Sequence, residues 1–303
     1  MWIRFVLCLL MFHLVATIGT AQDAKPAKVR VLLLGDSTVI GTFCRNLYPK
    51  ADHLEDVVRK LLAAEPDLPP VEVLNRGVNG DMVSLLLARP QRYESDVIKQ
   101  PPLDFIFLRY GLNDIRHVKD FQTEFPASYK KLIARLRADQ PKAEIVLETV
   151  IPFFSDERNR TINDHVRAIA AAEKLPVLDQ HVPYAAELTK GPNMLFWRRL
   201  PLKEIPAKYH ALIPPASIRG DVVYVGDNLL DVHLAKVPDW FKDRHPNLAG
   251  YQVLGNQIAD YLGRRLRAKA KAGKLDVPDR SRIGLLAGRA SDGFSMSVAC
   301  ASG

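Results

Sequence analysis

Hydrophobic residues occur along the chain first as a short continuous run and then at helical spacing. Residues 29–34 are almost all apolar and the run stops at Gly35, which is typical of a strand buried on both faces. Between Pro49 and Pro66, apolar residues recur on one face of a helix. These residues are Leu54, Val57, Val58, Leu61 and Leu62. The pattern predicts a strand, a loop and a helix that Pro49 opens.

The same alternation of strands and helices continues to residue 178. Further strands are predicted at residues 71–74, 103–108, 144–150 and 176–178. Further helices are predicted at residues 82–88, 127–138 and 162–174. Strands that alternate with helices imply right-handed crossovers and helices on both faces of a parallel sheet. We therefore expect an α/β fold with a five-stranded parallel sheet.

The alternation fails between residues 183 and 242, where prolines interrupt the chain repeatedly. Only residues 222–225 resemble a strand there. We interpret residues 183–242 as an insertion that caps the edge or the mouth of the sheet, before the loop that contains His245. Helical spacing returns from Leu248 to Leu266, and Pro246 and Asn247 would start this amphipathic helix.

The first 21 residues resemble a secretory signal peptide. They contain one arginine, Arg4, then an apolar run over residues 5–18 and small residues before a cut after Ala21. The run is interrupted by His13 and is shorter than the roughly 20 residues that span a bilayer. We therefore predict cleavage after Ala21, a secreted or periplasmic protein, and no stable membrane insertion.

The rest of the chain is interpreted as residues 22–270, one domain that includes the insertion, and residues 271–303, a basic and then low-complexity tail. The formal charge of +8 is spread along the sequence, which gives nucleic-acid binding little support. The three cysteines form no CxxC pair, so zinc ribbons and disulfide scaffolds are excluded. HExxH is absent, and His210 and His233 lack partners at ligand spacing, so we expect neither a metal nor a cofactor.

Polar residues follow the predicted strands at the edge where parallel sheets bind ligands. They are Gly35–Ser37 after the first strand, Asn75–Asp81 after the second, Gly111–Asp114 after the third, and Asp243–Asn247 before the last helix. A serine, a glycine-containing turn, an amide and a histidine thus gather at one rim. These are the parts of a nucleophile, an oxyanion hole and a general base.

In their order and composition these four blocks resemble the SGNH family of serine hydrolases, also called GDSL-type esterases, over residues 29–265. The resemblance implies a flavodoxin-like three-layer α/β/α sandwich. It implies that Ser37 is the nucleophile and His245 the general base, and that Gly80 and Asn113 complete an oxyanion hole with the N–H of Ser37. The serine does not lie in a G-x-S-x-G elbow, so the other common hydrolase motif is absent.

The acid of the triad departs from the family pattern. The family usually places an aspartate three residues before the histidine, where this chain has Lys242. We favour Asp243, two residues before the histidine, as the orienting acid. Asp239, Asp231 or a dyad with a backbone carbonyl remain alternatives.

Arg109 ends the third predicted strand at the same rim. It either pairs with Asp36, Asp81 or Asp114 or meets an anionic group of the substrate. We favour the pairing and keep Arg109 as a candidate substrate-binding residue.

The resemblance favours an exported esterase that removes acyl groups, acetyl above all, from small-molecule or carbohydrate esters. Acyl transfer on the same site, a lysophospholipase-like or thioesterase-like activity, and an inactive carbohydrate-binding relative are the alternatives. A nucleotide-binding protein is disfavoured because P-loop and GxGxxG motifs are absent. Six aromatic residues of the insertion either stack on sugar rings or pack inside the insertion. They are Phe196, Trp197, Tyr209, Tyr224, Trp240 and Phe241.

Overall fold

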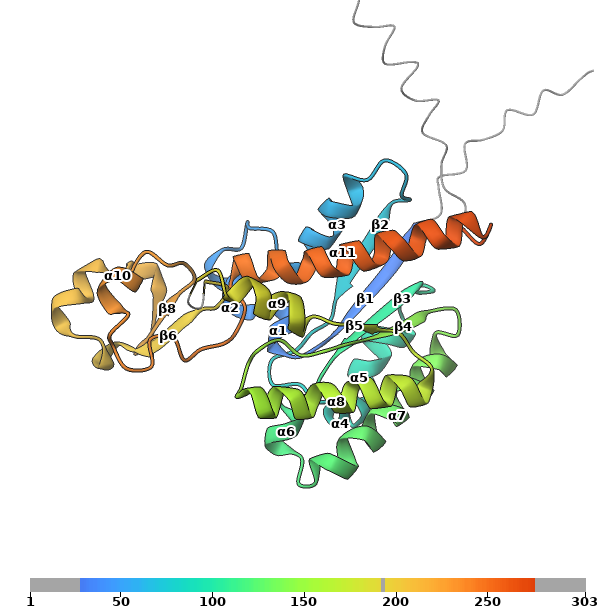
Figure 1. The fold of residues 1–303 in the computed structure, drawn as a ribbon, viewed down its shortest axis with the longest axis horizontal. Helices are drawn as coiled ribbons and strands as arrows, with labels where there is room; N and C mark the ends of the chain where they lie inside the picture. Colours follow the sequence, from blue (N-terminus) through green and yellow to red (C-terminus); the bar gives the residue numbers. More distant parts are fainter. Residues whose placement is uncertain (1–27, 192–193, 276–303) are drawn as a thin grey trace, which may run out of the picture.

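The computed structural model describes residues 28–191 and 194–275, and its centre is a five-stranded parallel sheet (Figure 1). The strands are β1 (Val29–Gly35), β2 (Val71–Asn75), β3 (Phe105–Arg109), β4 (Glu144–Glu148) and β5 (Val177–Leu178). Their order in the sheet is β2-β1-β3-β4-β5. This is the flavodoxin-like order, in which the direction of winding reverses between β1 and β3. The predicted five-stranded parallel sheet is confirmed.

Helices cover both faces of this sheet (Figure 1). One face carries α3 (Leu54–Ala63), α9 (His181–Leu188) and α11 (Leu248–Lys271). The other carries α4 (Val83–Leu87), α5 (Pro90–Tyr93) with a π-helical turn at 94–98, α7 (Phe121–Asp139) and α8 (Asp156–Glu173). The short helices α1 (Ser37–Ile40), α2 (Thr42–Leu47) and α6 (Asp114–His117) follow β1 and β3. The three-layer α/β/α sandwich is therefore confirmed.

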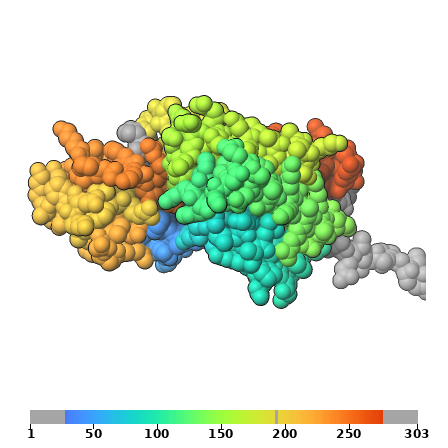
Figure 2. Space-filling model, turned by 90° about the horizontal axis from the view of Figure 1, so that it is seen from below, coloured from blue at the N-terminus to red at the C-terminus, as the bar shows by residue number. Residues whose placement is uncertain are grey.

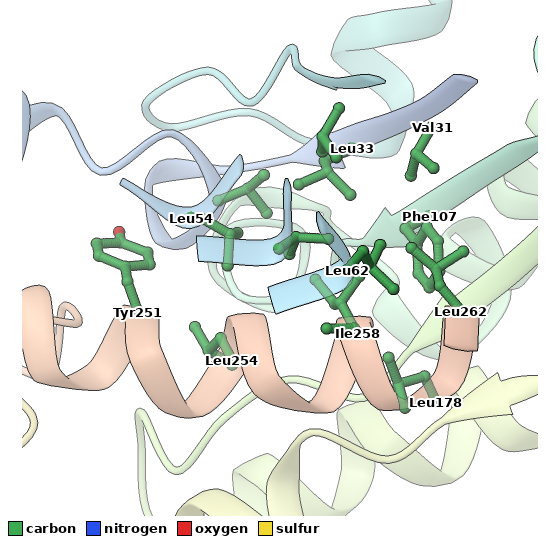
Figure 3. Packing of buried hydrophobic residues seen from close by; sticks show 14 of the residues in the cluster. Val31, Leu33, Leu54, Leu62, Phe107, Leu178, Tyr251, Leu254, Ile258 and Leu262 are labelled. Carbon is green, nitrogen blue, oxygen red and sulfur yellow. The ribbon is translucent and has the colours of Figure 1, made fainter. Parts of the chain in front are cut away.

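Alternate residues of the central strands supply two hydrophobic cores. Val31 and Leu33 belong to the core beneath α3 and α11, whereas Leu32 and Leu34 belong to the core on the opposite face. Figure 3 shows the first of these cores, with Ile258 and its neighbours on α11 pointing at the strands. Because β1 is buried on both faces, its sequence is apolar at every position except Arg30, which is only half-buried.

Several helix boundaries differ from the prediction because polar side chains set them. Helix α3 begins after His53, whose N–H donates to the Asp56 carboxylate, and Pro49 lies in the preceding turn. Helix α7 begins well before residue 127, because Asp120 accepts a hydrogen bond from the backbone of Thr123. Helix α11 continues to residue 271, so much of the cationic segment is helical.

The inserted segment folds into a small antiparallel sheet at one end of the molecule, coloured yellow to orange (Figure 2). Its strands are β6 (Arg198–Pro201), β7 (Ile218–Arg219) and β8 (Val222–Val225), in the order β6-β8-β7. Turns of 3-10 helix at 202–204, 207–212 and 215–217 and the helix α10 (Asp231–Leu234) complete it. The sequence predicted β8 alone, and residue 183 falls inside α9 of the main sandwich.

The segments predicted as a signal peptide, residues 1–21, and most of the tail, residues 276–303, lie outside the described residues. Within residues 28–191 and 194–275, no helix combines the length and the apolar character needed to cross a membrane.

Candidate active site

Ser37 is held at the carboxyl end of β1, as the first residue of α1. Asp36 caps this helix, because its Oδ1 accepts hydrogen bonds from the N and Oγ1 of Thr38 at 2.8 and 2.7 Å. A Cβ on Gly35 would lie 2.6 Å from the carbonyl oxygen of Arg109, so only glycine fits between the two strands. Ser37 therefore stands at a helix N-terminus, where backbone N–H groups lack partners inside the helix.

The serine, the histidine and Asp243 form a continuous chain of contacts. Ser37 Oγ lies 2.9 Å from His245 Nε2, and His245 Nδ1 lies 2.7 Å from Asp243 Oδ1. The same carboxylate oxygen accepts the backbone N–H of His245 at 2.8 Å. This double acceptance makes a spacing of two residues sufficient for the aspartate to reach the imidazole.

The two alternative acids are engaged elsewhere. Asp239 contacts Lys242 Nζ at 2.9 Å on the surface, and Asp231 binds Arg198 and the indole N–H of Trp240. The geometry therefore brings Asp243 to the histidine and leaves these two away from it.

An arginine of the insertion balances the charge of Asp243. Arg199 Nε, from β6, lies 2.9 Å from Asp243 Oδ2. Burial opposes ionisation of Asp243, but hydrogen bonds and charge from His245, together with Arg199, outweigh it and hold the pKa of this carboxyl below its usual value. Sequence reasoning missed Arg199, which lies in an irregular stretch without a recognisable motif.

The histidine loop is fastened to the insertion. The backbone N–H of Trp197 donates to the His245 carbonyl oxygen at 3.0 Å. Asn247 caps α11 by accepting the N–H of Gly250 at 2.9 Å, and its Nδ2 donates to the carbonyl of Met194. The His-Pro-Asn sequence thus ends a loop and starts a helix in one fixed position.

Gly80 and Asn113 lie on the other side of Ser37. Gly80 has a φ of 69°, a left-handed conformation that glycine adopts without strain. The side-chain amide of Asn113 donates one hydrogen bond to the carbonyl of Asp81 at 3.1 Å. An asparagine amide has a second N–H, which can serve an oxyanion.

Buried carboxylates fix these two loops. Asp81 accepts hydrogen bonds from Arg92 and Tyr110 at 2.8 and 3.0 Å. Asp114 accepts the backbone N–H groups of Gly111 and Val83, both at 3.1 Å. Burial raises the pKa of Asp114 to about 7, against the opposing effect of these hydrogen bonds.

A cavity of about 250 Å³ opens above the serine and the histidine. Its lining includes both proposed oxyanion residues, Gly80 and Asn113. Seven further residues line the cavity, of which only Asn79 and Leu112 lie within the blocks predicted from the sequence. They are Phe43, Asn79, Leu112, Arg116, Phe153, Phe154 and Arg199. Phe153 and Phe154 follow β4 at the carboxyl edge of the sheet. Their position after a predicted strand is the sequence feature that could have identified them as cavity residues.

Arg109 does not reach this cavity, contrary to its candidacy as a substrate-binding residue. Its side chain is 0% exposed, its Nη2 donates to the carbonyl of Thr38 at 2.9 Å, and its Nη1 lies 3.7 Å from Glu148 Oε1. The ion pair is thus with Glu148 and not with one of the three aspartates considered. Glu148 is the last residue of β4 and Arg109 the last residue of β3. Because these strands are neighbours in the sheet, the two side chains lie close together.

The insertion's aromatic residues do not line the cavity either. Phe196, Trp197 and Trp240 are at most 1% exposed and pack in the cores. Tyr224 packs against Phe43 in a tilted arrangement, with ring centres 4.8 Å apart. The burial of Phe196, Trp197 and Trp240 agrees with the packing alternative for these three residues.

Within the described part of the chain, no cluster of three or more histidine, cysteine, aspartate or glutamate side chains is arranged to hold a metal ion.

The sequence matches the GDSL-like lipase/acylhydrolase family over residues 33–253. Comparison with curated proteins gave no match. Among solved structures, the chain is similar to Axe2, an acetylxylan esterase from Geobacillus stearothermophilus, with 20% identity, a TM-score of 0.48, and coverage of 79% of this chain and 96% of that one. It is also similar to a member of the lipolytic protein G-D-S-L family from Veillonella parvula, with 19% identity, a TM-score of 0.48, and coverage of 78% and 100%. Because the family match spans more than half of its length, the chain belongs to the GDSL-like lipase/acylhydrolase family and is a carboxylic ester hydrolase.

Proposed function

We propose that the protein is a serine esterase that hydrolyses short acyl esters, acetyl esters above all, through an acyl-enzyme on Ser37. The observation that carries this proposal is the contact chain from Ser37 through His245 to Asp243, at 2.9 and 2.7 Å, which opens into a cavity shared with Asn113. These are the positions of a nucleophile, a general base and an orienting acid.

The proposed reaction has two halves. In the first, His245 Nε2 takes the proton of Ser37 Oγ, which attacks the acyl carbon and expels the alcohol after His245 returns the proton to it. In the second, His245 deprotonates a water molecule that releases the acid from Ser37. The N–H groups of Ser37 and Gly80 and the amide of Asn113 stabilise the oxyanion in both halves.

The size of the cavity supports a short acyl group. Its volume of about 250 Å³ is below the roughly 300–1,000 Å³ of pockets that hold drug-sized ligands. A long lipid chain would need an extended apolar groove, whereas Asn79, Arg116 and Arg199 give this cavity polar walls. These polar walls can donate hydrogen bonds to the hydroxyl groups of a carbohydrate alcohol on the open side of the cavity. The predicted signal peptide would export the enzyme.

A series of p-nitrophenyl esters tests the acyl preference. We expect kcat/KM to fall from acetate to butyrate to octanoate, because longer chains exceed the cavity, and we expect acetate release from acetylated oligosaccharides. A kcat/KM that rises with chain length would instead favour the lipid or thioester alternatives.

Replacement of Asn113 by alanine tests the oxyanion assignment. We expect kcat to fall by roughly 10²- to 10³-fold with little change in KM, because the lost donor acts mainly in the transition state. Steady-state kinetics on p-nitrophenyl acetate measure both constants. A change confined to KM would make Asn113 a substrate-binding residue and not an oxyanion donor.

A further inference from the structure

Two arginine side chains are among the residues that line the cavity above Ser37, while no carboxylate is among its described lining residues. Arg116 and Arg199 line the cavity directly. The guanidinium carbon of Arg158 lies 5.1 Å from the ring centre of Phe154, which also lines it. Three guanidinium groups, from α6, β6 and α8, therefore lie on or beside its wall.

Two of these arginines lie next to different parts of the proposed catalytic machinery. Arg116 stands three residues after Asn113 in one helical turn, and its backbone N–H donates to the Asn113 carbonyl at 3.1 Å. Residues three apart share a helix face, which explains why both side chains line the cavity. Arg199 lies on the histidine side, where it contacts Asp243.

The charge on the wall of this cavity is only partly neutralised. Arg199 shares its charge with Asp243, but no described carboxylate forms an ion pair with Arg116, which is exposed. Asp36 and Asp243, which flank Ser37 and His245 in sequence, are 1% and 7% exposed and already accept hydrogen bonds from their own loops. Apolar walls such as Phe153 strengthen the remaining positive field inside the cavity.

We propose that this arginine-lined cavity selects acyl esters whose alcohol part carries an anionic group, a carboxylate or a sulfate, close to the esterified hydroxyl. On a carbohydrate, this class is an acylated acidic sugar. Arg116 is the main determinant, because no carboxylate of residues 28–191 and 194–275 pairs with its planar guanidinium, which can donate two parallel N–H groups to such an anion. The inference rests on the proposed function, since it concerns the alcohol side of the same ester.

A general role of the arginines in stabilising the oxyanion gives a different expectation. Such a role would accelerate neutral and anionic esters alike, because the oxyanion forms in both reactions. The ratio of kcat/KM for an anionic ester to kcat/KM for a matched neutral ester therefore isolates recognition of the anion.

The experiment compares 4-acetoxybenzoate with its methyl ester, which share the acetyl group and the aromatic ring. We expect the anionic-to-neutral ratio to fall roughly fivefold in Arg116→Gln and by at least tenfold in Arg116→Glu. Added salt should lower the wild-type ratio by screening the exposed charge. Arg264→Gln removes the same charge from α11, away from this cavity, and should leave the ratio unchanged.

Each outcome has a defined meaning. A graded fall from Gln to Glu supports the proposal. The same fall with 4-acetoxybenzenesulfonate, whose sulfonate mimics the charge and terminal oxygens of a sulfate, extends it from carboxylates to sulfur oxyanions. If Arg116→Glu hydrolyses the neutral ester and keeps the wild-type anionic-to-neutral ratio of kcat/KM, selection by charge is wrong. The proposed esterase activity is unaffected by that result. If the wild-type protein hydrolyses neither ester, both the proposed function and this inference are contradicted.

Discussion

Ser37→Ala should lower kcat for p-nitrophenyl acetate by roughly 10⁵- to 10⁶-fold, to a rate near the limit of detection. The substitution removes the nucleophile. Without it no acyl-enzyme can form, although the histidine and the oxyanion donors are still present. The fold should persist, because Ser37 is only half-buried and its Oγ contacts the histidine alone among the described side chains.

Thermal unfolding of the same preparation checks that expectation, since a preserved transition separates lost chemistry from lost structure. Ser95→Ala serves as the matched control, because Ser95 is an exposed serine outside the cavity and should keep wild-type kinetics. Turnover by Ser37→Ala within about tenfold of wild type would exclude the proposed nucleophile.

Asp243→Asn should be the second most damaging change, with a loss of roughly 10³- to 10⁴-fold in kcat. Asp243 Oδ1 fixes the orientation of the His245 ring at 2.7 Å and stabilises the positive charge that the imidazole gains during the reaction. Asp239→Asn is the matched control, because Asp239 contacts only Lys242 on the surface and should cost less than about twofold.

The pH profile adds a readout that misfolding would not mimic. Because the folded pKa of Asp243 lies below its usual value, its contribution to stability is present above the unfolded pKa and is lost as the pH falls through that lowered pKa. In Asp243→Asn, this acid-dependent part of the free energy of unfolding should disappear, because the amide does not titrate. A near-normal rate and profile would instead favour a dyad.

The central sheet and the four sequence blocks were predictable because short-range features determine them. Strand β1 is apolar at every buried position, and the glycines and polar residues after each strand mark where the chain turns at the carboxyl edge. The sheet order then places Ser37 and Asn113 on either side of the point where the winding reverses.

The insertion and its contribution to the site were not predictable in the same way. Strands β6 and β7 have only four and two residues, and pairing with β8 stabilises them more than their own composition does. The contact between Arg199 and Asp243 depends on that tertiary arrangement. Likewise, the pairing of Arg109 with Glu148 follows from the adjacency of β3 and β4, which the apolar pattern alone does not specify.

Covalent labelling distinguishes a Ser37 nucleophile that is activated in the folded protein from an unreactive serine. The purified protein is treated with a fluorophosphonate, digested, and the modified peptide is identified by mass spectrometry. We expect one adduct, on Ser37, formed by the native protein and strongly slowed in a His245→Ala variant, because the histidine must remove the hydroxyl proton. An adduct on a different serine, or no adduct on the folded protein, would contradict it.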